Sequence, residues 1–324
     1  MVRIVKQPEN FTPIGEGLIF VVQSDERCDL EVAIINTLTG EEVGRKLIYD
    51  TTEAVVDIAP YIAGMSPLTV PKRHFSELLS APAASYMIVV QREGEVVESE
   101  EVWVSNNIVK EGVGVASIFA TGECREIAYG DDDDLKIKAP EAGLISVEVL
   151  SDIGESYSYS INSESGRAMF HLGTRMFDES VTRIVVEVYC NEEFLQSVDY
   201  EIVPRGANSM RLMWFSPIGT LEHHTFAATL SRTLVSKQRQ RFVGSNGEVC
   251  SSISAEQTTI GSKRCSERLL AALATIVTAP KVWIEQAEEY VPAAVLDSEA
   301  AISRLGEVGQ LSVTLEHNRK EVTL

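Results

Sequence analysis

The sequence predicts a mainly β protein: two tandem β-sandwich domains of the Ig-like type, followed by an α+β domain in which one amphipathic helix covers a sheet. Three observations favour this fold class. Runs rich in β-branched residues fill the first two-thirds of the chain, one strand pattern recurs, and one convincing helix occurs near the C-terminal end. A chain of 324 residues has room for two or three domains of ~100–150 residues each. We place these domains at 1–105, 106–204 and 205–324.

The first domain is predicted from six short strand-like segments separated by turn signals such as TGEE and REGE, a set that fits a β-sandwich. The segments are GLIFVVQS (17–24), CDLEVAIINT (28–37), EVGRKLIYD (42–50), EAVVDIA (53–59), SYMIVVQR (85–92) and EVVESEEVWVS (95–105). The stretch 66–82 contains Pro67, Pro71 and Pro82. Because proline cannot donate to a β-ladder, we expect a loop with one helical turn there.

The second domain echoes the first. The segment YMIVVQREGEVVESEEVWVS ends the first domain and TRIVVEVYCNEEFLQSVDYEIVP ends the second, each with an Ile-Val-Val strand, an acidic turn and a closing strand. Ile88 and Ile184 are 96 residues apart, whereas Ser99 and Ser197 are 98 apart, so the alignment needs a two-residue insertion. Two tandem sandwiches are the economical explanation.

The third domain contains the helix. In SERLLAALATIV (266–277) an apolar stripe has helical spacing, Ser266 is a suitable N-cap, and Pro280 cannot continue the hydrogen-bond ladder. The stripe consists of Leu269, Leu270, Leu273, Ile276 and Val277. Strands are predicted at MRLMWFS (210–216), HTFAATLSRTLV (224–235), KVWIEQ (281–286) and QLSVTLEH (310–317), with a polar span at 236–263.

Charge is unevenly distributed along the chain. Residues 1–204 hold 15 Lys+Arg and 36 Asp+Glu, a net of −21, whereas residues 205–324 hold 13 and 12, a net of +1, which together give the formal charge of −20. The shift favours a domain boundary near 205. An acidic surface of this size repels nucleic acid and anionic lipid, so we expect neither as a partner. The apolar run 269–280 is also shorter than the ~20 residues of a membrane-spanning helix.

The five cysteines predict free thiols. They are widely spaced, and neither a CxxC pair nor a dense disulfide framework is present. They are Cys28, Cys124, Cys190, Cys250 and Cys265.

Glu222-His223-His224 is the first candidate site, as a metal or proton-transfer centre. On a strand, His223 and His224 point to opposite faces and cannot converge on one ion. Glu222 and His224 could share a face, but two ligands without a third make a poor metal site. We therefore expect these residues to be ordinary members of a strand pair.

The run GDDDDLKIKAP contains the second candidate, Asp131–Asp134. The EF-hand spacing is absent, although weak calcium binding stays open as an alternative. Because like charges repel, we expect a solvated turn that leads into the strand LKIKA. The basic run SKQRQR (236–241) has one adjoining aromatic residue, so it favours a solvated face or an acidic protein partner over nucleic acid.

Motifs of catalysis and cofactor binding are incomplete in this sequence. GVGVAS (112–117) lacks the third glycine of a dinucleotide loop, VGSNGE does not satisfy G-x-S-x-G, and a P-loop is missing. We therefore assign no catalytic, cofactor-binding or metal-ligating residue, and expect a protein that is not an enzyme.

The opening PENFTPIGEGLIFVVQS, with Pro8, Phe11 and Pro13, and the later EAVVDIAPYI resemble the N-terminal module of virion proteins from phages and prophages of Bacteroidetes. These proteins often open their last domain with W-x-N-x-x-G-x-x-(D/E)-x-x-x-F. Trp214, Gly219, Glu222 and Phe226 match that pattern, while Ser216 replaces its Asn and Pro217 is added. TAPKVWI is similar to the segment after the helix in the same group.

The resemblance implies a non-enzymatic structural or assembly protein of a phage or prophage particle, tail-associated, without a cofactor, and cytoplasmic before assembly. It implies that Trp214 and Phe226 anchor the core of a strand pair with Gly219 in its turn. The alternative is a surface or secreted β-sandwich protein that binds carbohydrate. The N-terminus lacks the features of a signal peptide, but a secreted protein with its signal removed would look the same.

The charge distribution also predicts how copies would meet. The acidic first two domains repel their own copies, whereas residues 205–324 are near neutral and carry SKQRQR, which could contact an acidic face of a neighbouring copy. We therefore expect self-association, or docking on other virion proteins, through residues 205–324. A monomer in which the 236–263 span is a mobile loop stays open as the alternative.

Overall fold

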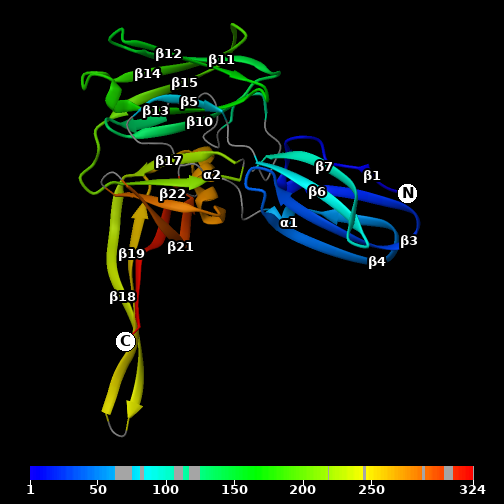
Figure 1. Cartoon of the computed structure of the whole chain (residues 1–324). Helices are drawn as coiled ribbons and strands as arrows, with labels where there is room; N and C mark the ends of the chain where they lie inside the picture. Colours follow the sequence, from blue (N-terminus) through cyan, green and yellow to red (C-terminus); the bar gives the residue numbers. More distant parts are fainter. Residues whose placement is uncertain are drawn as a thin grey trace. The chain divides into compact units, whose positions relative to one another are not determined.

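The computed structural model (Figure 1) is mainly β, with several sheets and one short amphipathic helix. It describes residues 1–62, 75–80, 84–105, 112–116, 125–217, 219–243, 246–286, 289–302 and 309–323. The chain divides into two compact units. Unit 1 consists of Met1–Pro71 and Ser80–Gly112, and unit 2 of Lys72–Leu79 and Val113–Leu324. The predicted boundary at 205 lies inside unit 2, between two sets of sheets.

Unit 1 is a six-stranded sheet in the order β1-β3-β6-β7-β2, with β4 also paired to β3. Its described strand pairs are antiparallel except β2 with β7, which is parallel. Its strands are β1 (Val2–Lys6), β2 (Thr12–Pro13), β3 (Ile19–Asn36), β4 (Glu42–Asp57), β6 (Ala84–Arg92) and β7 (Glu95–Ser105), with the short helices η1 (Ile14–Glu16) and α1 (Ala59–Ile62).

Four predicted strands of unit 1 are in fact two long ones. The segments 17–24 and 28–37 form β3, and 42–50 and 53–59 form most of β4, because the β3–β4 ladder resumes after a register shift between Gln23 and Cys28. Such a bulge bends a strand without ending it. Buried side chains from both halves of β3, including Phe20 and Ile34, therefore belong to one core.

Unit 2 begins with a β-sandwich. One sheet has the order β5-β13-β10-β8 and the other β12-β11-β14-β15-β9. The first contains β5 (Glu77–Ser80), β13 (Arg167–Gly173), β10 (Asp132–Lys138) and β8 (Gly114–Ala116); the second contains β12 (Ser156–Ser163), β11 (Gly143–Ser151), β14 (Arg183–Cys190), β15 (Glu193–Val203) and β9 (Arg125–Ala128), and η2 (Thr174–Met176) follows β13. Alternate residues such as Leu135 and Ile137 on β10 pack with Val147 and Val186 on the facing sheet.

The stretch expected as a loop with a helical turn contributes a strand to this sandwich. Within 66–82, Glu77–Ser80 forms β5 next to β13, which corrects the prediction for these four residues; 66–74, 81 and 82 lie outside the described residues. Leu78 packs against the sandwich core. β5 lies at one edge of its sheet.

The rest of unit 2 is a seven-stranded antiparallel sheet in the order β17-β16-β20-β21-β22-β19-β18. Its strands are β16 (Met210–Phe215), β17 (Leu221–Phe226), β18 (Ala228–Val243), β19 (Asn246–Gly261), β20 (Val282–Gln286), β21 (Glu289–Ile302) and β22 (Gly309–Thr323). The polar span 236–263 is therefore mostly a strand hairpin, not a loop. In Figure 1 the yellow β18–β19 hairpin extends beyond the other strands of its sheet.

The predicted helix is confirmed as α2 (Glu267–Ala274), continued by η3 (Thr275–Thr278). Ser266 caps it: its Oγ accepts a hydrogen bond from the Leu269 N–H at 3.2 Å. Leu270, Leu273 and Ile276 pack on the sheet, whereas Val277 is 43% exposed. Among the helices that the structure describes, none is long and apolar enough to cross a membrane.

Candidate functional site

The run Asp131–Asp134 is buried, which corrects the prediction of a solvated turn. The four residues are only 0–4% exposed, and β10 begins at Asp132. Alternation along β10 places Asp133 on the side of Leu135, inside the sandwich, and Asp132 and Asp134 on the outer side. Their partners confirm this division, because those of Asp133 lie on the facing sheet of the sandwich and those of Asp132 and Asp134 include residues of the seven-stranded sheet.

Inside the sandwich, Asp133 is held by two side chains. The Tyr200 hydroxyl on β15 donates to its Oδ2 at 2.8 Å, and the Arg125 guanidinium on β9 makes an ion pair with the same oxygen. Burial and the Asp133 charge both raise the pKa of Tyr200, so this phenol stays protonated and donates. Burial by itself would lower the pKa of Arg125, but the carboxylate of Asp133 raises it. The charges therefore neutralise each other within the core.

On the outer side, Asp134 lies between two histidines. His171 Nδ1 on β13 is 2.9 Å from Oδ1, and His223 Nε2 on β17 is 2.7 Å from Oδ2. Burial alone would raise the pKa of Asp134, but the hydrogen bonds and charges of both imidazoles lower it. Asp134 is therefore an acceptor and each facing ring nitrogen a donor. Against the effect of burial, Asp134 and then Asp132 and Glu77 raise the pKa of His171.

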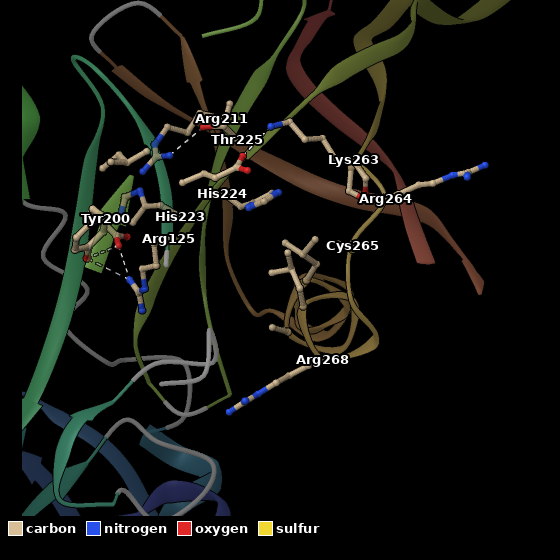
Figure 2. Close-up of a pocket in the computed structure, with 17 residues that line it drawn as sticks. Arg125, Tyr200, Arg211, His223, His224, Thr225, Lys263, Arg264, Cys265 and Arg268 are labelled. Atoms are coloured by element: carbon tan, nitrogen blue, oxygen red, sulfur yellow. Dashed lines mark hydrogen bonds and ion pairs between the residues drawn. The ribbon is translucent and has the colours of Figure 1, made fainter. Parts of the chain in front are cut away.

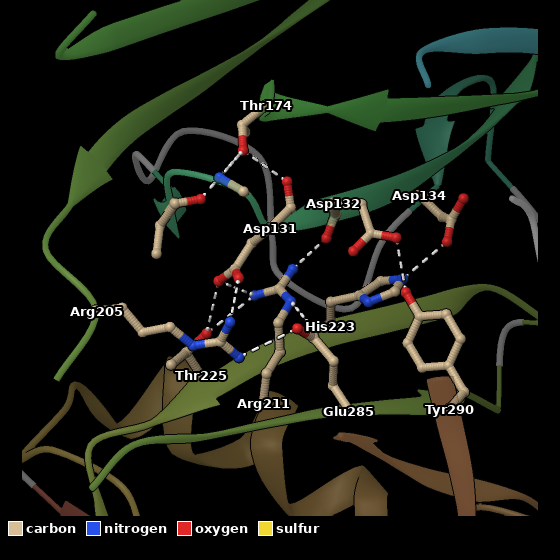
Figure 3. Close-up of polar contacts among 12 residues, drawn as sticks. Asp131, Asp132, Asp134, Thr174, Arg205, Arg211, His223, Thr225, Glu285 and Tyr290 are labelled. Atoms are coloured by element: carbon tan, nitrogen blue, oxygen red, sulfur yellow. Dashed lines mark hydrogen bonds and ion pairs between the residues drawn. The ribbon is translucent and has the colours of Figure 1, made fainter. Parts of the chain in front are cut away.

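Asp131 and Glu285 share two arginines, as Figure 3 shows. Arg205 is 3.2 Å from each carboxylate, and Arg211 on β16 is 3.5 Å from each. Arg211, 2% exposed, also donates to the backbone carbonyl of Asp132. These contacts join the start of β10 to the strands β16 and β20.

Asp132 completes the group. The Tyr290 hydroxyl on β21 donates to its Oδ2 at 2.7 Å, and His171 Nε2 is 3.6 Å away. Burial would raise the pKa of Asp132, but the charges of His223, Arg211 and His171 and the Tyr290 hydrogen bond lower it. We call Asp131–Asp134 together with the partners described above the ion cluster; its members are Arg125, Asp131, Asp132, Asp133, Asp134, His171, Tyr200, Arg205, Arg211, His223, Glu285 and Tyr290.

The ion cluster fastens the sandwich to the seven-stranded sheet. Each Asp of the run contacts at least one Arg, His or Tyr side chain. Within the residues described, no group of three His, Cys, Asp or Glu side chains has the arrangement of a metal site. Calcium would have to displace arginine and imidazole partners from these carboxylates. Removing one partner of a buried ion pair typically costs about 3–5 kcal/mol of stability, so the contacts are a strong fastening once formed.

The other candidate, Glu222-His223-His224, lies on β17 in a strand pair, as predicted, and its histidines point to opposite faces. The expectation that they are ordinary strand residues is wrong for His223, which faces β10 and contacts Asp134. Glu222 is buried and accepts from the Thr220 hydroxyl. His224 packs edge-on against Phe226 with ring centroids 5.1 Å apart, and burial, with the charges of Arg211 and Lys263, lowers its pKa to about 3.

Local sequence could not have found the ion cluster. Asp134 and His223 are 89 residues apart, and Asp132 and Tyr290 are 158 apart. The one local indication is the burial pattern of β10: Leu135 and Ile137 predict a strand with an inner face, and extending the same alternation backwards places Asp133 inside.

The motif around Trp214 is placed as the resemblance implies. Trp214 and Phe226 are fully buried on β16 and β17, and Gly219 has a φ of 73° in the turn between them. The turn is closed by the Ser216 N–H, which donates to the Thr220 carbonyl at 2.9 Å. Their core and turn roles are confirmed, and these roles are structural.

A pocket of ≈200 Å³ adjoins the ion cluster (Figure 2), with walls from β9, β10, β15, β16 and β17, the 262–265 segment and α2. Leu269 and Leu273 supply apolar lining. Its buried cations, Arg125 and Arg211, already contact carboxylates, and at its rim Lys263 pairs with Glu126 at 2.8 Å. Arg264 and Arg268 also line the pocket, which lies at the seam between sandwich and sheet.

The cysteines that the structure describes with their side chains have free thiols. Cys190 and Cys265 are buried and Cys28 is partly buried, while Cys124 lies outside the described residues and the side chain of Cys250 is likewise not described. Burial raises the pKa of Cys190 and of Cys265, which disfavours the reactive thiolate.

No protein-family model and no curated protein matches the chain. Among solved structures it is similar to a two-domain fibronectin type III segment of chicken tenascin, 8% identical with a TM-score of 0.21, over 61% of this chain and 95% of that one. A complex of Dpr2 Ig1-Ig2 with DIP-Theta Ig1-Ig3 is 8% identical with a TM-score of 0.24, over 100% and 99%.

The SafA pilin in complex with the SafB chaperone from Salmonella enterica is 10% identical with a TM-score of 0.24, over 62% of this chain and 96% of that one. At these identities and TM-scores the likenesses carry no conclusion about function. The chain is a mainly β protein with several sheets, and what can be inferred about its role rests on its own residues.

Proposed function

We propose that the chain is a non-enzymatic assembly protein of a phage or prophage particle, in a tail-associated position. The observation that carries this proposal is the structural use of the ion cluster. Five carboxylates, two histidines and three arginines are residue types that active sites use, but here they contact partners within the cluster and join the sandwich to the seven-stranded sheet. The resemblance around Pro8 to Phe20 and Trp214 to Phe226 supplies the phage context.

The proposal includes the division into domains: two tandem Ig-like sandwiches at 1–105 and 106–204, then an α+β domain at 205–324. The partners that we propose are further copies of the chain or other virion proteins, which it contacts through residues 205–324. The near-neutral charge of that segment, beside a net of −21 in residues 1–204, supports it.

The rival function is carbohydrate binding by a surface or secreted sandwich. A carbohydrate reader would gather exposed aromatic rings on one face. In the described residues, the exposed aromatic side chains are dispersed: Tyr49 lies on β4, Trp103 on β7 and Phe194 on β15, while Phe75 and Tyr129 lie outside the strands. Trp103 moreover stacks on Phe11, with ring centroids 6.3 Å apart. This dispersal favours assembly.

Induction of the strain that carries the gene tests the proposal. Particles released by the strain are purified and analysed by mass spectrometry, and the same preparation is made from a strain with the gene deleted. We expect the chain at a fixed copy number per particle and incomplete particles in the deletion strain. Complete, infectious particles that lack the chain, or a chain recovered on glycan resin instead, would contradict the proposal.

A further inference from the structure

Among the strands that the structure describes, β18 has one long edge that pairs with no other strand. It is 16 residues long, stands last in its sheet, and pairs with β19 on one side. At its start the Thr229 N–H donates to the Asn208 carbonyl at 2.8 Å, so the open edge begins at Leu230. Leu230 and Leu234 are 56% and 71% exposed. An uncovered edge with apolar side chains is a template for another strand.

Unit 1 has an unpaired edge of its own on β7 within the described residues, and β1 lies near this strand without pairing to it. The loop before β2 covers its end, because the Phe11 N–H donates to the Trp103 carbonyl at 2.6 Å and the Trp103 N–H donates to Asn10 Oδ1 at 3.0 Å. From Glu95 to Val102, no described strand pairs with the side of β7 that faces away from β6. Val96 and Val97 are 61% and 40% exposed.

The two edges carry opposite charge. The β18 sequence contains four cations and no acid, a net of +4, whereas β7 contains four glutamates and no cation, a net of −4. The cations are Arg232, Lys237, Arg239 and Arg241, and the glutamates are Glu95, Glu98, Glu100 and Glu101. Charged residues on an edge normally block pairing. In this chain they block the pairing of β18 with β18 of another copy and of β7 with β7 of another copy. They favour the pairing of β18 with β7.

We propose that β18 of one copy adds as a strand to β7 of the next copy, in a head-to-tail contact. Backbone hydrogen bonds along both open edges supply the affinity, the exposed leucines and valines add apolar contact, and the opposite charges select the partner edge. Because the two surfaces differ, the contact is heterologous and each copy keeps one free edge of each kind. Repetition therefore builds a ring or a filament.

The inference deepens the proposed assembly role and rests on it for its biological setting, while the contact itself is a property of the purified chain. The two ideas fail separately. A chain that is present in particles but stays monomeric in solution contradicts the strand contact alone. Copies that associate through these edges but never enter a particle contradict the assembly role alone.

Sedimentation velocity over a concentration series, at 0.15 M and 1 M salt, measures the contact on the full chain. We expect concentration-dependent oligomers that weaken at 1 M salt, where the Debye length falls from ~8 to ~3 Å. The double variants Arg232→Glu/Lys237→Glu and Glu98→Lys/Glu100→Lys should each weaken association about tenfold or more, since like charges then face each other. A one-to-one mixture of the two variants should regain it, because each altered edge then meets a complementary one.

The matched control is Arg319→Glu/Lys320→Glu, the same charge change as in the β18 variant at two exposed residues on β22, where this strand pairs with β19. It should leave association unchanged. Amide hydrogen exchange should show new protection at Leu230–Val235 and Glu95–Glu101 in the oligomer. Monomers at every concentration, an equal loss in the control, a mixture that stays dissociated, or oligomers without protection at both edges would each overturn the proposal.

Discussion

Two segments of this chain contain four acidic residues each, and they differ in burial. The glutamates of β7 are exposed or partly exposed on an open edge, whereas Asp131–Asp134 are almost completely buried. The difference does not lie in the local charge. Asp131–Asp134 meet Arg125, His171, Arg205, Arg211, His223 and two tyrosines from other strands. In the described structure the β7 glutamates have no comparable set.

The comparison shows what decides whether an acidic run is buried. A lone buried carboxylate costs several kcal/mol, so an acidic run is buried only where the fold supplies cations and donors. Those partners come from both the sandwich and the seven-stranded sheet. A run that looks like a solvated turn is therefore a contact between two sheets.

The largest expected effect comes from Arg211→Leu. Arg211 is 2% exposed and contacts Asp131, Glu285 and the Asp132 carbonyl, so its removal leaves two buried carboxylates short of a cation. We expect a loss of about 3–5 kcal/mol in the free energy of unfolding, measured by urea titration. Arg319→Leu, at an exposed position on β22, is the control and should change stability by less than about 0.5 kcal/mol. Equal effects would abolish the distinction between the buried and exposed charges.

The pH dependence of stability sharpens the comparison next. The pKa of His171 is raised in the folded state. Its contribution to the free energy of unfolding is therefore complete below the unfolded pKa of ~6.5 and is lost as pH rises through the folded pKa. His224 has the opposite sign: with a folded pKa of about 3, its contribution is complete above ~6.5 and is lost as pH falls toward 3.

Denaturant titrations from pH 4.5 to 9 check both signs. His171→Gln should flatten the loss of stability on the alkaline side of ~6.5, and His224→Gln should flatten the loss on the acid side. Each variant serves as the control of the other. A pH profile that neither substitution changes, or one in which the two sides are exchanged, would contradict the pKa shifts of His171 and His224.

Tyr290→Phe has an intermediate expected effect. The substitution removes a 2.7 Å hydrogen bond to Asp132 and preserves the ring. A hydrogen bond to a charged group contributes ~1.5–3 kcal/mol, so we expect a loss near the lower end, because Asp132 keeps His171 nearby. Tyr49→Phe, at a residue that is 70% exposed, is the control for loss of a phenol hydroxyl. Similar unfolding midpoints for the two variants would contradict the assignment.

The smallest expected effect is that of Glu100→Gln on β7. An exposed charge among like charges contributes within about ±0.5 kcal/mol, and here its removal relieves repulsion from neighbouring glutamates. Thermal unfolding of unit 1 should shift little or slightly upward. Asp134→Asn, the corresponding change in the ion cluster, should lower stability clearly. A large loss from Glu100→Gln would mean that β7 is as dependent on its charges as β10 is.

Local rules predicted most of the backbone and little of the site. The helix was predictable because its stripe, N-cap and terminating proline lie within 15 residues, 266–280. The strand pair around Trp214 and Phe226 was predictable because its turn is short. The 66–82 prediction failed at β5 because a four-residue strand depends on β13, nearly 90 residues away, for its pairing.

The ion cluster was missed for the same reason on a larger scale. Repulsion among Asp131–Asp134 is visible in the sequence, but the arginine and imidazole partners that outweigh it come from β9, β13, β16 and β17. Without the fold, nothing in the sequence pairs Asp134 with His223. The hairpin β18–β19 was underestimated because its many polar residues do not show the apolar alternation of a strand.

A double-mutant cycle between Asp134 and His223 tests most directly whether the buried carboxylates hold the sandwich to the seven-stranded sheet. The two groups are 2.7 Å apart, on β10 and β17. Stabilities of the parent, Asp134→Ala, His223→Ala and the double variant give the coupling energy. We predict a favourable coupling of about 1.5 kcal/mol or more, as found for close charge pairs across interfaces. A coupling below about 0.5 kcal/mol, the level of independent sites, would contradict the account.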